Sequence, residues 1–255
     1  MLAPIAVVGL GQLGTLFAEG FLRLGHPVFP RRRTDDLSEL EAIEPKLVLV
    51  AVGEDDLAPV LERLPKKLLA RVALLQNELR PIQWQSRGVR DPSVAVVWFE
   101  RKNGKPPSVV LPTRLFGPER ELLERALAPF DVRAEPFDSS ELAHELCLKN
   151  LYILGLNLTG LGSQKKAREL LEPDRTLFDD VITDVLAVER ALFGASVQLD
   201  EARLRRELDQ ALWADAEHAA AGRSAKARLT RTLAHARSAS VSVPTLERLA
   251  EIHSK

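Results

Sequence analysis

The sequence has 255 residues, 45% of them apolar and 28% charged, with a formal net charge of −1 at pH 7. This length suits two domains that share a cleft better than one small module. The near-neutral charge argues against a nucleic-acid partner, and no stretch approaches the roughly 20 apolar residues that a membrane span needs.

The cysteine content and the first residues both indicate a cytoplasmic protein. Cys147 is the only cysteine, so the chain cannot form an intramolecular disulfide, which fits a reducing compartment. The N-terminal residues lack the positive flank and the cleavage site of a signal peptide. We therefore expect a cytoplasmic protein whose partner is a small-molecule substrate.

The first half of the chain alternates short apolar runs with amphipathic stretches, the pattern of a parallel sheet covered by helices. Strands are expected at residues 5–8, 27–29, 46–52, 72–75 and 94–98, with smaller ones at 109–111 and 115–116. The sequence therefore predicts a Rossmann-type parallel-sheet domain over residues 1–137.

The second half has few glycines and prolines, and its apolar residues recur at helical spacing. Helices are expected at residues 141–158, 174–193, 200–220, 224–238 and 244–253. The fold class is therefore α/β, with an all-α domain over residues 138–255 that provides substrate contacts and dimerisation.

A glycine-rich turn follows the first apolar run and leads directly into a predicted helix. In such a turn the first glycine forms the bend, the second lets backbone N–H groups approach a pyrophosphate, and the third lets the helix pack on the strand. The helix N-terminus adds partial positive charge. The predicted cofactor-binding residues of this turn are Gly9, Leu10, Gly11, Gln12, Leu13 and Gly14.

The residues after the second strand favour NADP over NAD. An NAD-binding domain usually places an acidic residue there for the ribose hydroxyls, whereas this chain has Arg31, Arg32 and Arg33, with no carboxylate before Asp35. Guanidinium groups bind a phosphate through charge-assisted, bidentate hydrogen bonds. The alternative interpretation is that the three arginines form a solvated loop.

The helix expected over residues 141–158 has the residues best suited to chemistry. Lys149 and Asn157 are eight residues apart and so share a helical face. A lysine among apolar residues can stabilise an alkoxide and then donate a proton, while an amide can hold a substrate hydroxyl or carboxylate. The alternatives are a surface lysine and an amide that bonds nearby backbone.

Other polar residues in the second half gave weaker signals. His144 and His218 have no evident carboxylate partner in the sequence pattern, so we interpret them as bystanders. Asp215, Glu217 and His218 form no recognisable metal-ligand set, and no metal is predicted. The basic stretch 223–237 is interpreted as a solvated helix face.

The glycine turn, Asn77 after an apolar strand, Lys149 with Asn157 and the terminal segment 241–245 together resemble the ketopantoate reductase family. The likeness extends over nearly the whole chain. It implies an NADP-dependent reductase of a 2-keto acid, with Lys149 matching the catalytic lysine and Asn77 matching the asparagine near the nicotinamide. It also implies a homodimer.

The chain departs from the family pattern at several positions that contact the substrate. Glu78 follows Asn77 where the family has glycine, and Gly53 stands where it has lysine. Ile153 replaces a second substrate-binding asparagine, and neither Ala214 nor segment 224–226 supplies the family's serine and glutamate. We therefore expect a reductase of another small carbonyl compound. The part of that compound that meets Ile153 should be less polar than the family's substrate.

Two alternatives remain open from the sequence. One is a related 3-hydroxyacid dehydrogenase or imine reductase, because those families also join a GxGxxG unit to a helical domain with a lysine. The other is a non-catalytic NADP-binding sensor, which the missing serine and glutamate suggest.

Overall fold

The computed structural model describes residues 2–102, 105–163, 165–171 and 175–253. It divides into two compact units, Met1–Leu142 and Ala143–Lys255. The first contains a parallel-dominated sheet covered by helices and the second is helical, so the predicted fold class is confirmed. No helix in the described part of the chain is long and apolar enough to cross a membrane.

The sheet of the first unit has seven strands in the order β2-β1-β3-β4-β5-β8-β9. The first five strands in this order, β2, β1, β3, β4 and β5, are parallel to one another. Strand β8 is antiparallel to β5, and β9 is parallel to β8. The strand bounds are Ile5–Val8 (β1), Val28–Arg31 (β2), Leu47–Val50 (β3), Val72–Leu74 (β4), Ser93–Val96 (β5), Thr113–Phe116 (β8) and Ala134–Pro136 (β9). Strands β6 (Phe99–Glu100) and β7 (Ser108–Val109) form a separate pair.

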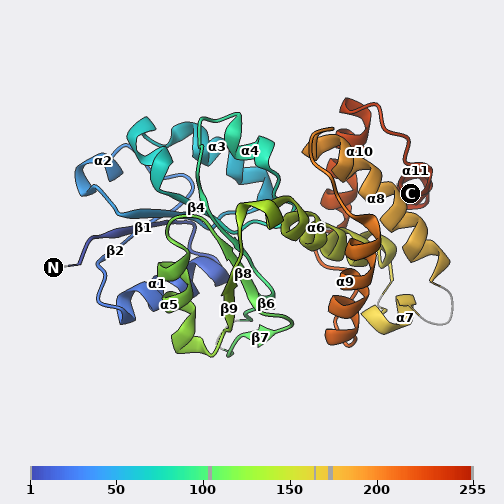
Figure 1. Ribbon diagram of the computed structural model, residues 1–255, viewed down its shortest axis with the longest axis horizontal. Helices are drawn as coiled ribbons and strands as arrows, with labels where there is room; N and C mark the ends of the chain where they lie inside the picture. The colour runs from blue at the N-terminus through green and yellow to red at the C-terminus, as the bar shows by residue number, and fades with distance from the viewer. Residues whose placement is uncertain (1, 103–104, 164, 172–174, 254–255) are drawn as a thin grey trace. The chain divides into compact units, whose positions relative to one another are not determined.

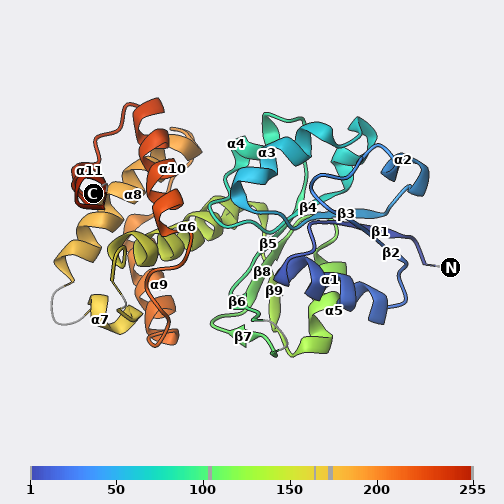
Figure 2. The ribbon, with the colours of Figure 1, turned by 180° about the vertical axis from the view of Figure 1, so that it is seen from behind.

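Helices cover both faces of this sheet (Figures 1 and 2). Helices α1 (Gln12–Arg23) and α5 (Arg120–Leu127) pack on one face, where Phe17, Phe21 and Leu123 are fully buried. Helices α3 (Glu54–Arg63) and α4 (Pro81–Gln85) lie on the other face, and α2 (Leu40–Ile43) precedes β3. Because the chain continues from β1 to β2 on one side and to β3 on the other, β1 lies at the point where the strand order reverses, where α/β sheets bind ligands.

The second unit consists of α6 (Leu142–Thr159), α7 (Ala167–Leu171), α8 (Thr176–Phe193), α9 (Glu201–Ala214), α10 (Ala225–Ser238) and α11 (Pro244–His253). Helix α6 is apolar on most sides, as expected of a helix surrounded by protein. Side-chain hydrogen bonds join it to α8, to α9 and the residue after it, and to α10.

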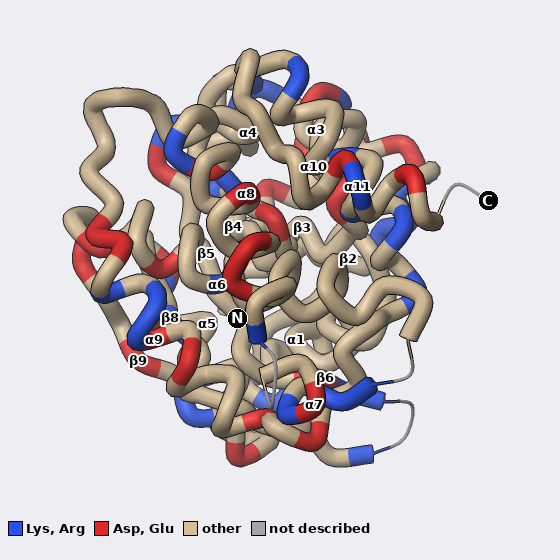
Figure 3. Tube along the Cα trace, turned by 90° about the vertical axis from the view of Figure 1, so that its right-hand side faces the viewer, with Lys and Arg blue, Asp and Glu red and all other residues tan. Residues whose placement is uncertain are grey.

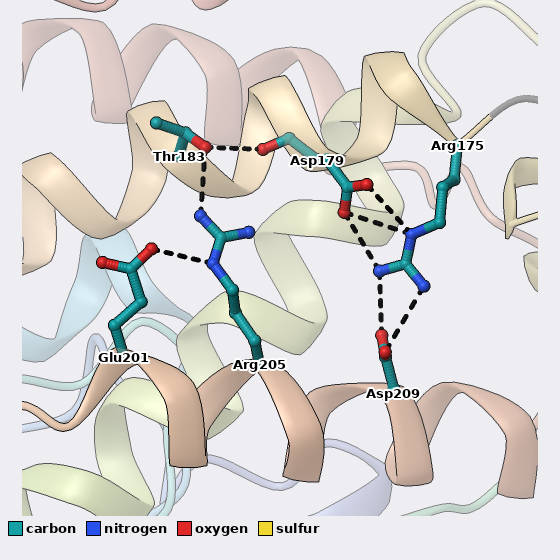
Figure 4. Close-up of polar contacts among 6 residues, drawn as sticks. All are labelled: Arg175, Asp179, Thr183, Glu201, Arg205 and Asp209. Atoms are coloured by element: carbon teal, nitrogen blue, oxygen red, sulfur yellow. Dashed lines mark hydrogen bonds and ion pairs between the residues drawn. The ribbon is translucent and has the colours of Figure 1, made fainter.

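An ion-pair network joins α8 to α9 (Figure 4). The Arg175 guanidinium donates to the carboxylates of both Asp179 and Asp209. One helical turn along, Arg205 donates to Glu201 and to the Thr183 hydroxyl. Elsewhere Lys and Arg alternate with Asp and Glu along both units (Figure 3), as the near-neutral net charge indicates.

Several elements differ from the expected ones, including the two-residue strand β6, which lies outside every expected strand. Helix α9 ends at Ala214, not near residue 220, because the following segment pairs with residues next to α7: the Ala167 N–H donates to the His218 carbonyl, and Lys166 bridges to Ala219. Strand β9 and helix α7 were not expected. Both are short, and neither contains enough residues for a hydrophobic period to be recognised.

Candidate functional site

The glycine turn lies between β1 and α1, and its backbone requires glycine at positions 9 and 14. Gly9 has φ +98°, and a Cβ there would lie 2.5 Å from the Ala51 carbonyl oxygen. A Cβ at Gly14 would overlap the Gly9 carbonyl. A Cβ at Gly11 would meet nothing within 4 Å, so backbone at this point faces open space into which a phosphate can come close.

The N-terminus of α1 is suited to an anion. The helix begins at Gln12 with Gly11 as its N-cap; no side chain caps it, and its first turn contains no acidic residue. The first backbone N–H groups and the helix dipole therefore present partial positive charge at the turn. Leu13 and Gly14 complete the first helical turn.

A cavity of about 450 Å³ opens beside the turn at the carboxyl ends of β1, β2 and β3. Its walls are the segments 9–11, 32–34 and 51–53, with Asp56 from α3. The cavity is within the range of small-molecule and cofactor sites and lies where the sheet topology places one.

The three arginines after β2 differ in their surroundings. Arg31 is the last residue of β2, and its guanidinium pairs with Glu39 at 3.0 Å, whereas Arg32 and Arg33 line the cavity. Arg33 pairs with Asp56 at 3.0 Å. The exposed Arg32 side chain has no hydrogen bond or ion pair within the described residues. Arg32 is thus the arginine whose guanidinium is most readily available to a phosphate.

Arg63, which the sequence analysis did not identify, fixes the shape of this basic loop. Its guanidinium, at the end of α3, donates to the backbone carbonyls of both Arg33 and Asp35. This contact spans the sequence from β2 to the end of α3, so no local pattern could have predicted it.

Asn77 is half-buried in a turn three residues beyond the end of β4. The preceding residue ties this turn to the sheet, because the Gln76 Nε2 donates to the Val50 carbonyl at 2.6 Å. The next residue, Glu78, is buried with φ +56°. The backbone thus adopts a left-handed conformation where the family has glycine, although a side chain is strained there by about 1 kcal/mol or more.

Lys149 lies on α6, with its Nζ 5.1 Å from the centre of the Tyr152 ring. The Tyr152 hydroxyl donates to Asp215 at 2.9 Å, and Asp215 pairs with His218. Burial, helped by the positive charge of Arg228 and opposed by the negative charge of Asp215, lowers the pKa of Lys149 to about 7. A lysine with a pKa near neutrality can donate a proton and also exist without one under ordinary conditions.

Asn157 bonds a side chain rather than neighbouring backbone. Its Oδ1 accepts a hydrogen bond of 2.7 Å from Arg228 of α10, and both side chains are more than nine-tenths buried. The interpretation of 223–237 as a solvated face was therefore wrong at Arg228. The sequence could not distinguish this arginine, because neighbouring basic residues of the same helix are exposed.

His144 and His218, the two histidines of the second unit that were interpreted as bystanders, both have carboxylate partners. His144 is 2.6 Å from Glu207, and His218 is 3.1 Å from Asp215. Glu207 becomes a neighbour of His144 only through tertiary folding. Asp215 becomes a neighbour of His218 through the turn after α9. Asp215 and His218 thus belong to the surroundings of Lys149.

The site residues fall into one group in each unit. The first unit contains the glycine turn, Arg32, Arg33 and Asn77, and the second contains Lys149 with Asn157 and Arg228.

Comparisons by sequence found no matching family model and no matching curated protein. Comparisons by structure gave extensive matches. A PanE/ApbA family ketopantoate reductase from Ralstonia eutropha JMP134 matches with TM-score 0.69 and 17% identity over 98% of this chain and 96% of that one. A dimeric ketopantoate reductase from Staphylococcus aureus matches with TM-score 0.66 and 16% identity over the same shares.

The chain has the fold of the ketopantoate reductases. The predicted likeness to this family is therefore confirmed at the level of the fold, for a sequence that has diverged widely. The same fold occurs in a D-mandelate dehydrogenase solved with NADH, which matches with TM-score 0.66 and 12% identity over 98% of this chain and 97% of that one.

Proposed function

We propose that this chain is an NADPH-dependent reductase of a small carbonyl compound of the 2-keto acid type. The observation that carries the proposal is Lys149, a half-buried lysine with a pKa of about 7 on the central helix of a ketopantoate reductase fold. Burying a charged lysine costs free energy, so a catalytic role explains its position more readily than packing does.

The residues of the first unit fit a dinucleotide. Open space at Gly11 and the uncapped N-terminus of α1 would receive the pyrophosphate, and Arg32 and Arg33 would hold the 2′-phosphate. Arg31, paired with Glu39, contributes charge from further away. When bound, NADPH supplies the hydride.

The chain's own residues would perform the remaining chemistry. The Lys149 ammonium donates a hydrogen bond to the substrate carbonyl oxygen and then a proton to the alkoxide. Asn77 orients the reacting groups from the turn after β4, and Asn157 contacts the substrate beyond the carbonyl. The dimeric S. aureus structure supports a homodimer, and the single cysteine supports a cytoplasmic location.

Oxidation of NADPH and NADH by the purified protein, followed by absorbance, tests the function. We expect NADPH to be consumed with 2-keto acids in preference to 3-keto acids and cyclic imines. Faster turnover of either of the latter would favour the dehydrogenase or imine reductase alternative. Tight NADPH binding without turnover of any carbonyl compound would favour the sensor.

Dissociation constants of Arg32→Ala test the choice of cofactor. We expect this variant to bind NADPH about 10- to 100-fold more weakly, because it loses a charged hydrogen bond worth about 1.5–3 kcal/mol, and to bind NADH as before. Arg31→Ala is the matched control and should change NADPH affinity less. Equal or tighter binding of NADH by the wild type would overturn the NADP assignment.

A further inference from the structure

Two of the three arginines after β2 already have carboxylate partners. Arg31 pairs with Glu39, and Arg33 pairs with Asp56, a residue of the cavity wall whose own negative charge disfavours a phosphate nearby. These charges largely cancel, so they give the cavity little net attraction for a dianion. Recognition of a 2′-phosphate therefore depends mainly on where the third arginine, Arg32, is held in the cavity wall.

Arg32 is held through its backbone. Its N–H donates to the Asp35 carboxylate at 2.7 Å, and its carbonyl accepts from the Asp35 N–H at 3.1 Å, which closes a short turn over residues 32–35. These four residues include no apolar side chain that could anchor the turn in the core. Hydrogen bonds must therefore hold it against the rest of the domain, and they determine where the Arg32 side chain starts.

Arg63 joins this turn to α3, whose last residue it is. Its Nη1 donates to the Arg33 carbonyl and its Nη2 to the Asp35 carbonyl, so one rigid guanidinium fork holds two points of the turn. Because α3 follows β3 directly, the contact connects the turn to the 51–53 wall of the cavity. The helix dipole would favour any basic residue at this helix end, but it does not require a fork directed at two carbonyls.

We propose that Arg63 is a positioning residue for cofactor specificity, which holds the turn 32–35 so that the Arg32 guanidinium faces the 2′-phosphate of NADPH. This inference rests on the proposed NADPH-dependent function. It assigns part of the preference for NADPH to a residue that lies outside the arginine run and acts through it. Arg32 and Arg63 should then behave as a unit.

Two nucleotides that differ only in the 2′-phosphate test the proposal without turnover. Adenosine 2′,5′-bisphosphate and adenosine 5′-monophosphate are each titrated calorimetrically into the purified protein. We expect the wild type to bind the bisphosphate about 10- to 100-fold more tightly than the monophosphate. Arg63→Met should bind the bisphosphate about 10-fold more weakly than the wild type does and bind the monophosphate as before.

The control Arg71→Met removes the same kind of contact at the other end of β3. Arg71 is also exposed, and its Nη1 donates to the Pro45 carbonyl at 2.8 Å, just before that strand begins. This variant loses one positive charge and one arginine-to-backbone contact, and it should leave the preference for the bisphosphate unchanged. If Arg63→Met does not fold, Arg63→Lys, which keeps the charge but lacks the planar fork, replaces it in every measurement and should lose part of the preference.

A double-mutant cycle separates positioning from the charge of Arg63. Arg32→Ala should weaken bisphosphate binding about 10- to 100-fold in the wild type but by no more than about 3-fold in Arg63→Met, where Arg32 is no longer held. Amide hydrogen exchange of residues 32–35 in the unliganded protein should be about 3-fold faster, or more, in Arg63→Met.

Additive losses in the cycle, or unchanged exchange over residues 32–35, would overturn the inference and leave the NADP assignment intact. Equal binding of the two nucleotides by the wild type would instead overturn the NADP assignment of the proposed function, and the role of Arg63 with it.

Discussion

Lys149 is the residue on which the proposed chemistry depends, and three other residues determine its environment. Tyr152 of the same helix contacts the ammonium through its ring, Asp215 after α9 supplies negative charge, and Arg228 of α10 supplies positive charge. Burial and Arg228 outweigh Asp215, so the pKa falls to about 7. The proton that Lys149 would donate in the proposed reaction is thus held weakly enough to be transferred near neutral pH.

The pH dependence of carbonyl reduction follows from this value. Lys149 must be protonated to act as the acid, so kcat/KM should be constant below its pKa and fall about tenfold per pH unit above about 7. Lys149→Arg keeps the positive charge to high pH, so its residual activity should lack this decline. If the wild type and Lys149→Arg showed the same fall of kcat/KM at high pH, the fall would have to be assigned to another group.

The local pattern of the sequence was enough to select the turn residues, Lys149 and Asn157 as candidates, because a strand, glycines and helical spacing are recognisable in a short window. It was not enough to find Arg63 or Arg228. Their contacts join residues that are far apart in the chain, and only the fold brings these together.

Helix α6 is the element that organises the second unit. Three of its buried polar side chains each contact a different partner: Asn150 bonds Glu189 of α8, His144 bonds Glu207 of α9, and Asn157 bonds Arg228. Buried polar contacts of this kind fix the rotation of a helix, because rotating it would leave several groups without partners. They keep Lys149 and Ile153 on the less buried face of α6.

Removal of one such contact should destabilise the protein. Asn150 and Glu189 are essentially fully buried, with 3.1 Å between Nδ2 and Oε2. Asn150→Ala removes a donor from the buried carboxylate and should lower the free energy of unfolding by about 1–3 kcal/mol. Urea denaturation measures this. The control Gln210→Ala, at an exposed helical amide, should change it by less than about 0.5 kcal/mol; equal effects would contradict this role.

At the level of elements, helix ends were predicted less well than helix positions. The long apolar periods of α6, α8, α10 and α11 placed these helices within a few residues of their observed bounds. Helix α9 was predicted to be too long because Asp215 and His218 belong to a turn that is stabilised by contacts with distant residues. Contacts with distant residues do not change the local spacing of apolar residues, so the sequence pattern does not reveal them.

For the molecule as a whole, the fold is shared with ketopantoate reductases whose sequences are very different. Identity to the matched reductases is 16–17%, yet the match extends over 98% of the chain. The positions retained include those that need glycine for steric reasons, whereas several polar substrate contacts have changed. This distribution fits the proposed function, a reductase with an altered substrate, since backbone geometry at the cofactor is less free to vary than side chains at the substrate.

Hydride transfer itself tests the central claim most directly. The protein is incubated with NADPH deuterated at the transferable position of C4 and with a panel of 2-keto acids, and mass spectrometry locates the deuterium. We expect deuterium on the carbinol carbon of one product. Lys149→Met should reduce the rate of transfer by about 10²- to 10⁴-fold without changing NADPH affinity. The account would be contradicted if NADPH bound but deuterium reached no carbonyl compound, or if Lys149→Met transferred it at the wild-type rate.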